Sequence, residues 1–242
     1  MNFLFFRARR VGCFLAIVGV CVTGGAYATG MLPDTPLLVI SEADGSAQMG
    51  LRNTENEPLL LHTTIVDLPD DKGPAVYALP PITRVEANGR QVVRFILEKT
   101  EQPLTVQHMK RVRFEGIPPA LTDQAGRAVV RLTIAQDLPV IISPRGLEQD
   151  PQPWKKITWT LTGNKIVVAN PSPFVARLSP EVDLLPSKQR VKLLTRTYLL
   201  PNESVTFTLP DGVNVAALTG LRVQPASPYG FSVEPYEVQL AR

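Results

Sequence analysis

Along most of the chain, apolar and polar residues alternate in short runs, and the clearest run lies between residues 127 and 142. Val130, Leu132 and Ile134 alternate there with polar neighbours, so their aliphatic side chains share one face of an extended chain. This period of two predicts a β-strand. Such a strand either buries its apolar face in its own domain or lends that face to another protein, and the alternation alone leaves both readings open.

The same rhythm recurs from Pro36 onward, and no stretch of the first half has a helical pattern of convincing length. Turn signals such as Asn88-Gly89 and Gly163-Asn164 separate the apolar runs. Short strands at this spacing are typical of immunoglobulin-like β-sandwiches, so we predict an all-β fold. The predicted strands cover residues 37–40, 48–52, 59–66, 75–79, 91–97 and 109–114, the segment described above, and residues 154–161, 165–169, 174–178, 191–194, 204–209, 220–223 and 231–240.

The composition changes between Ser143 and Pro153, where prolines and charged residues replace the alternating pattern. A segment of this kind favours a domain boundary. We therefore predict two immunoglobulin-like domains, at residues 29–145 and 154–242, joined by a linker at residues 146–153.

The first 28 residues have the pattern of a secretory signal peptide. Arg7, Arg9 and Arg10 precede an apolar run that ends at Val22, and Ala26-Tyr27-Ala28 offers the small residues of a cleavage site. A membrane anchor is the alternative, but the apolar run is short for a bilayer. We expect an exported protein that begins near Thr29.

Removal of this segment changes the composition in two ways. Both cysteines, Cys13 and Cys21, leave with it, so we expect no disulfide in the exported chain. Three of the 25 Lys and Arg residues also leave, and the remaining 22 balance 22 Asp and Glu residues. A nearly neutral chain gives no support for a nucleic-acid partner.

Few residues suggest catalysis or metal binding. His62 and His108 lie in different predicted strands, without cysteines or an acidic cluster at ligand spacing. There is no Gly-x-Ser-x-Gly turn and no glycine-rich phosphate loop. We expect neither an enzyme nor a cofactor.

Three blocks of the sequence resemble the PapD-like periplasmic chaperones of chaperone-usher pili. The first is the run Pro80-Pro81-Ile82-Thr83-Arg84-Val85-Glu86-Ala87-Asn88-Gly89 followed by Gln91-Val92-Val93-Arg94-Phe95. The second is Ile117-Pro118-Pro119, and the third is Asn170-Pro171-Ser172-Pro173-Phe174-Val175. The resemblance covers nearly the whole exported chain and implies two immunoglobulin-like domains in a boomerang arrangement.

The resemblance also implies a function and a binding strand. A pilus or fimbrial subunit resembles a sandwich without its last strand, and such a chaperone fills the open groove with a strand of its own. The donor residues of the family correspond to Val130, Leu132 and Ile134. Burial of three aliphatic side chains would contribute roughly 5–8 kcal/mol before ordering costs. The implied partners are pilus subunits and an outer-membrane usher in the periplasm.

The chain departs from the family at the residues that hold the carboxylate of the subunit. Basic side chains are usual at the positions of Leu38 and Pro139, and neither residue present here can pair with a carboxylate. Arg145, just after the donor segment, is our candidate substitute, although a solvated linker charge is the simpler interpretation.

A second departure concerns the ion network between the domains of the family. Arg94 corresponds to its basic member, but Gln107 and Ser227 stand where the acidic partners are expected. Because an unpaired buried charge is costly, we expect Arg94 to find another partner or to remain in water.

Other interpretations remain open at this stage. Val130, Leu132 and Ile134 can be ordinary core residues, and Arg111 and Arg113 can be a solvated face rather than a subunit-facing one. The protein can also be a two-domain structural or adhesive component of a surface fibre. If the donor strand is exposed without a client, a self-capping dimer would protect it.

Overall fold

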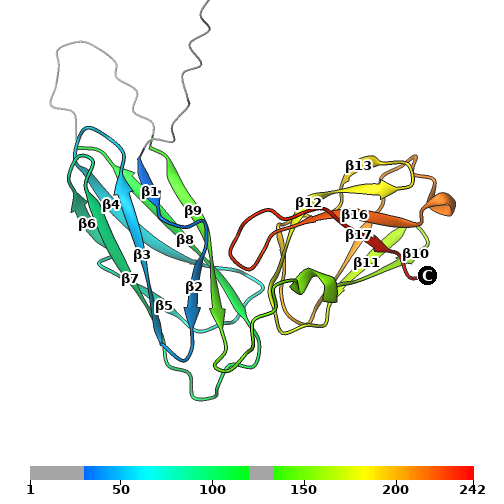
Figure 1. Cartoon of the computed structure of the whole chain (residues 1–242), viewed down its shortest axis with the longest axis horizontal. Helices are drawn as coiled ribbons and strands as arrows, with labels where there is room; N and C mark the ends of the chain where they lie inside the picture. Colours follow the sequence, from blue (N-terminus) through cyan, green and yellow to red (C-terminus); the bar gives the residue numbers. More distant parts are fainter. Residues whose placement is uncertain (1–29, 120–132) are drawn as a thin grey trace, which may run out of the picture.

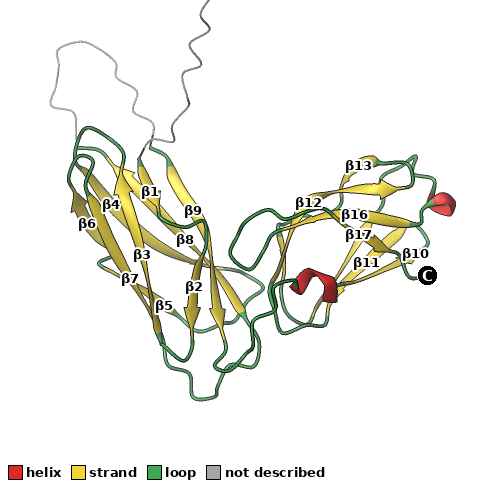
Figure 2. Ribbon diagram, in the orientation of Figure 1, coloured by secondary structure: helices red, strands yellow, loops and turns green. Residues whose placement is uncertain are grey.

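Nearly all the regular structure is β-strand, in agreement with the predicted fold class. The computed structural model describes residues 30–119 and 133–242, and within them two β-sandwiches are set at an angle to each other (Figure 1). Two short 3₁₀ turns, η1 (Pro153–Lys156) and η2 (Val215–Ala217), are the only helical segments in these ranges (Figure 2). None of the helices described there is long and apolar enough to cross a membrane.

The first domain is a sandwich of two sheets. One has the order β1-β3-β7-β5 and the other β2-β9-β8-β4-β6. All pairings are antiparallel except β2 with β9, which run parallel over Leu38–Ser41 and Val140–Ser143. The strands are β1 (Met31–Pro33), β2 (Leu38–Ser41), β3 (Ser46–Asn53), β4 (Leu59–Asp67), β5 (Val76–Leu79), β6 (Ile82–Val85), β7 (Arg90–Leu97), β8 (His108–Ile117) and β9 (Ala135–Ser143).

The core of this domain follows from the alternation along its strands. Phe95 of β7 and Phe114 of β8 are fully buried and meet edge to face, with ring centroids 6.2 Å apart. Val140 and Ile142 of β9 are buried in the same cluster, and Leu138 packs against it. One face of β9 therefore belongs to the core of its own domain.

The second domain is a smaller sandwich. Its sheets have the orders β10-β11-β15 and β13-β12-β16-β17, and β14 pairs with the start of β12. Trp154 and Trp159 both lie in its buried cluster. The strands are β10 (Thr158–Thr162), β11 (Lys165–Asn170), β12 (Ala176–Leu185), β13 (Gln189–Lys192), β14 (Tyr198–Leu199), β15 (Glu203–Thr208), β16 (Gly220–Pro225) and β17 (Tyr236–Gln239).

Several predicted boundaries were wrong, and prolines account for most of the errors. Residues 154–157 form the 3₁₀ turn η1 and its end rather than a strand, because Pro153 at its start has a fixed φ and no N–H to donate. The predicted strand at 231–240 begins only at Tyr236, directly after Pro235. Strand β12 continues past Pro180 to Leu185, with a register shift between Leu178 and Val182 that accommodates the proline.

Candidate functional site

The predicted donor segment lies only partly within the described residues. Val130 and Leu132 fall outside them, whereas Ile134 is described and lies directly before β9. Its side chain is 49% exposed, so its own domain does not enclose it. The interpretation of Ile134 as an ordinary core residue does not fit this exposure.

The strand edge next to Ile134 has one neighbour only. Residues 135–142 of β9 pair with β8, but β2 covers the other edge only from Val140 onward. Among the described strands, none pairs with residues 135–139 on that side. A strand with a free edge offers unpaired backbone donors and acceptors to another chain.

The alternation of apolar residues in β9 begins in the donor segment that precedes it in the sequence. Leu138, Val140 and Ile142 share the core face of β9. In the sequence, Leu132 and Ile134 precede them at the same spacing of two, with the polar Gln136 between. The same alternation thus supplies core residues within β9 and is already present in the sequence before the strand begins.

The two domains meet through a small apolar cluster, which we call the hinge cluster. Its buried members are Leu37, Leu68, Met109, Ile141, Val175 and Leu200. Gln107 also joins the two domains by two hydrogen bonds. Its backbone N–H donates to the Pro173 carbonyl at 2.8 Å, and its side-chain Oε1 accepts from the Val175 N–H at 2.9 Å. The Arg196 guanidinium adds an ion pair to Asp70 at 2.9 Å.

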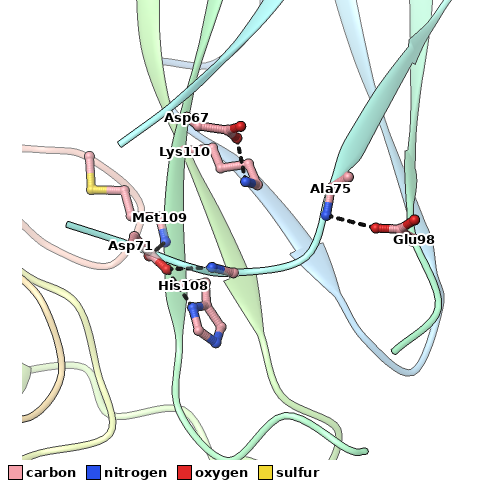
Figure 3. A network of polar contacts seen from close by, with 8 residues as sticks. Asp67, Asp71, Ala75, Glu98, His108, Met109 and Lys110 are labelled. Carbon is pink, nitrogen blue, oxygen red and sulfur yellow. Dashed lines mark hydrogen bonds and ion pairs between the residues drawn. The ribbon is translucent and has the colours of Figure 1, made fainter. Parts of the chain in front are cut away.

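A polar network beside the hinge cluster fixes the start of β8 (Figure 3). The buried Asp71 carboxylate accepts hydrogen bonds from the N–H of Met109 at 2.5 Å and of Gly73 at 2.8 Å, and its Oδ1 lies 2.6 Å from His108 Nδ1. Burial alone would raise the pKa of Asp71, but the hydrogen bonds from His108 and Met109 outweigh it and lower that pKa below the usual value. The loop that carries Asp71 is thereby attached to the start of β8, which carries Met109 and directly follows Gln107.

The neighbouring Lys110 has its side chain almost completely buried and forms an ion pair with the exposed Asp67 (Figure 3). The apolar stem of a lysine can cover core residues while its amine reaches a surface carboxylate. No group of three or more metal-ligating side chains occurs in the part of the chain that the structure describes.

A cavity of about 230 Å³ lies between the domains. The first domain contributes the ends of β2 and β9, the linker contributes residues around Gly146, and the second domain contributes the start of β12 and the loop after β16. Gln107 and Ser227, which replace the acidic residues usual in the resembled family, both line it, as does Arg177. The chain therefore brings together at this cavity several residues that the sequence had marked separately.

The two candidate anchors do not line this cavity. Arg94 is exposed on the other sheet of the first domain, where its Nη2 donates to Ser46 Oγ at 3.2 Å, as expected for an arginine without acidic partners. Arg145 is exposed at the linker, and its backbone N–H donates to Glu42 at 2.8 Å. A role of either side chain in subunit binding stays a prediction.

The structure also places the residues at the family's usual basic positions. Leu38 is buried in the core of the first domain, and Pro139 lies opposite Arg111 on β8. Sequence reasoning left open whether Arg111 is a solvated charge or faces the subunit, and it did not consider Arg177. Arg177 follows the block Asn170–Val175 by two residues, which is the only signal in the sequence that could have drawn attention to it.

Comparison with known proteins agrees with this geometry. Residues 30–148 match the family model of the N-terminal domain of PapD-type pili and flagellar-assembly chaperones, and residues 152–236 match that of the C-terminal domain of the pili assembly chaperone PapD. The uncharacterized fimbrial chaperone YhcA of Escherichia coli K12 is 40% identical over 224 residues, which cover 92% of this chain and 96% of the relative. The E. coli chaperone protein AfaB is 23% identical over 192 residues, 74% of this chain and 75% of the relative.

Solved structures share the fold. A chain from the complex of the Salmonella enterica SafA pilin with the SafB chaperone aligns with a TM-score of 0.72 at 18% identity, over 89% of this chain and 98% of that one. The E. coli chaperone DraB aligns with a TM-score of 0.69 at 21% identity, over 88% and 97%. The two family models together span almost all of the described residues, and they describe chaperones rather than enzymes. The chain therefore belongs to the PapD-like family of pilus-assembly chaperones.

Proposed function

We propose that this protein is a periplasmic chaperone that folds and caps pilus subunits by lending them the strand with Val130, Leu132 and Ile134. The observation that supports it most directly is the exposed Ile134 beside a strand edge with which no described strand pairs at residues 135–139. A subunit with an incomplete sandwich would gain main-chain hydrogen bonds along this edge and three aliphatic side chains in its groove.

The cellular setting follows from the same proposal. A secretory signal at residues 1–28 would deliver the chaperone to the periplasm, where it would meet subunits whose sandwich lacks a strand. Transfer of the subunit to an outer-membrane usher would then free the donor strand. The alternative, a structural or adhesive fibre component, is not favoured because the relatives are chaperones and both domains match chaperone models.

The donor strand is tested by the substitution Leu132→Asp. A carboxylate in an apolar groove loses its hydration without a partner, so co-purification with a subunit expressed in the same periplasm should be abolished. The isolated variant should keep the melting temperature of the wild type, because Leu132 lies before the first residue of β9.

The matched control is Thr133→Asp, which places the same charge on the neighbouring, exposed residue of the opposite face. This variant should still capture the subunit. Normal capture by Leu132→Asp, or equal loss in both variants, would show that the apolar face is not the donor.

The free edge also motivates a proposal for the client-free state. An exposed strand with apolar side chains favours association with a second copy of itself. We expect the wild type without a subunit to form dimers at high concentration and Leu132→Asp to remain monomeric, as measured by sedimentation equilibrium. A wild type that stays monomeric throughout would argue against self-capping.

A further inference from the structure

The outer face of the sheet β1-β3-β7-β5 carries arginines and exposed apolar side chains next to one another. Its members follow from the register, because side chains at paired positions point to the same side of a sheet. Leu32 pairs with Arg52, which pairs with Arg90 on the next strand. Further along β7, Arg94 pairs with Leu79 of β5. We call this surface the arginine face, and its outward side chains are Leu32, Gln48, Arg52, Tyr77, Leu79, Arg90, Val92 and Arg94.

Apolar side chains cover a large share of the arginine face. Leu32, Tyr77, Leu79 and Val92 are each 45–53% exposed, and they come from three of the four strands. No member of the hinge cluster belongs to these strands, so the contact between the domains leaves the face open. Clusters of exposed apolar side chains mark surfaces that bind a protein or a membrane.

Two of the three arginines are not neutralised by a carboxylate of the described residues. Arg90 forms an ion pair with Asp34, and this pair lies over Gly50, where any Cβ would collide with the Asp34 carboxylate. Arg52 forms no hydrogen bond or ion pair with another described residue, although it lies directly opposite Arg90. Arg94 has only the hydroxyl partner named above.

The position of Arg52 works against the stability of the sheet. Like charges at directly opposed positions of two strands repel each other, and within the described part of the chain no carboxylate compensates Arg52. Arg177 also lacks an ion pair there, but its Nη1 is buried beside the interdomain cavity, where no external surface reaches it. The positive charge of the arginine face is therefore open to a negatively charged partner.

We propose that the arginine face binds the surface of an anionic phospholipid membrane. A guanidinium pairs with a headgroup phosphate through two parallel hydrogen bonds, and its long stem reaches the phosphate while shorter apolar side chains enter the interface. Arg90, Val92 and Arg94 alternate along β7 in this way. The proposal rests on the periplasmic setting of the proposed function, in which the chain lies between two membranes, and it does not involve the donor strand.

A lipid surface is favoured over an acidic protein because of the spacing of the two free charges. Arg52 and the partner position of Arg94 are four residues apart on β3, roughly 13 Å, with Val92 between them on the face. A protein would have to present two carboxylates at this separation around an apolar centre of complementary shape. Lipid headgroups move laterally, so they supply phosphates wherever the arginines lie.

Binding of this kind should be weak and reversible. The predicted exported chain has 22 Lys and Arg and 22 Asp and Glu residues, so its net charge adds no general attraction. Each free arginine near an anionic surface should raise the partition coefficient about fivefold. The protein should therefore exchange between membrane and solution rather than remain anchored.

The face is tested by co-sedimentation of the exported chain with sucrose-loaded vesicles. Vesicles that contain phosphatidylglycerol should bind the protein, vesicles of phosphatidylcholine alone should not, and added salt should weaken the binding. Arg52→Gln and Arg94→Gln should each lower the partition coefficient about fivefold, and the double variant should lower it roughly 25-fold. Arg52→Lys and Arg94→Lys together should retain most of the binding, since lysine keeps the charge.

Two further variants complete the set. Val92→Ser should lower the partition coefficient at every salt concentration, because salt does not screen the burial of an apolar side chain. The matched control Arg113→Gln removes the same charge from an exposed position on the other sheet, and it should bind vesicles as the wild type does. Arg52→Gln should melt at the wild-type temperature or above it, because the repulsion from Arg90 has been removed.

Three results would overturn the proposal: no binding to the anionic vesicles, equal binding to both kinds of vesicle, or equal losses in Arg52→Gln and Arg113→Gln. A strongly lowered melting temperature of Arg52→Gln would assign Arg52 to the fold instead of to a binding surface.

The same variants separate the arginine face from the donor strand. Leu132→Asp should bind vesicles as the wild type does while failing to capture a subunit, and Arg52→Gln should capture the subunit normally. If Leu132→Asp captures subunits normally, the donor proposal fails whatever the vesicles show. If Arg52→Gln and Arg94→Gln together leave vesicle binding unchanged, only the present inference fails.

Discussion

At the scale of single residues, the buried Asn170 holds the backbone around the block at residues 170–175 by hydrogen bonds of its side chain. Asn170 Nδ2 donates to the carbonyls of Phe174 at 2.8 Å and Leu200 at 3.1 Å, and Oδ1 accepts from the hydroxyl of Ser172 at 2.7 Å. Asn53 has a similar role in the first domain, where its Nδ2 donates to the Glu57 carbonyl at 2.9 Å. Each asparagine satisfies backbone groups that no strand neighbour reaches.

Replacement of Asn170 by alanine should therefore be costly. Several buried carbonyls would lose their donor at once, and we expect a loss of about 2–4 kcal/mol in the free energy of unfolding, measured by urea denaturation. Asn164→Ala, at an exposed hairpin position of the same domain, is the control and should change the free energy by less than about 0.5 kcal/mol. Similar losses in both variants would contradict this role of Asn170.

The sequence predicted some of these residues and not others, for a physical reason. The block at residues 170–175 was recognised from its prolines and polar residues, which are adjacent in the chain. Arg177 was missed because its surroundings come from residues remote in sequence, Leu37 in one domain and Gly230 in the other. Whether a charge is buried without a partner depends on how two domains meet, and a local pattern carries no such information.

At the scale of elements, alternation predicted the strands in which the apolar period is uninterrupted. The predicted strand at 91–97 agrees with β7, because its apolar positions face a large core. The three-residue β1 and the four-residue β6, which lies directly after Pro80-Pro81, were not predicted. Neither element has a clear apolar period in the sequence, and their pairing with β3 and β4 decides that they form.

The loop that carries Asp71 gives a prediction about pH. The lowered pKa of Asp71 means that its charged form stabilises the fold above the usual carboxyl pKa of 3.8, and that this stabilisation is lost as the pH falls through the lower folded-state value. Asp71→Asn should thus cost about 1–3 kcal/mol in urea denaturation at pH 7 and progressively less below pH of about 4.

The exposed carboxylate of Asp211 provides the control for this prediction. Asp211→Asn should leave the stability almost unchanged at every pH. A difference between the wild type and Asp71→Asn that is the same at pH 7 and in acid would show that the charge of Asp71 is not what holds the loop to β8.

At the scale of the whole molecule, the angle between the domains is set by few contacts. The hinge cluster and the hydrogen bonds of Gln107 lie on one side of the junction, and the cavity with Arg177 lies beside them. Domains joined by a small interface move relative to each other unless it is well packed. The angle between the domains, and with it the shape of the cavity, thus depends on the hinge cluster.

Leu37 tests that dependence, since it is buried in the hinge cluster and lies just before β2 rather than within a strand. Its burial contributes about 1.5–3 kcal/mol, most of which Leu37→Ser removes from the contact between the domains. Small-angle scattering should then show a broader distribution of particle dimensions than that of the wild type. Leu32→Ser, which changes a leucine that is 45% exposed on β1, should leave this distribution unchanged. Unaltered scattering in Leu37→Ser would mean that the remaining contacts of Gln107 and Arg196 fix the angle by themselves.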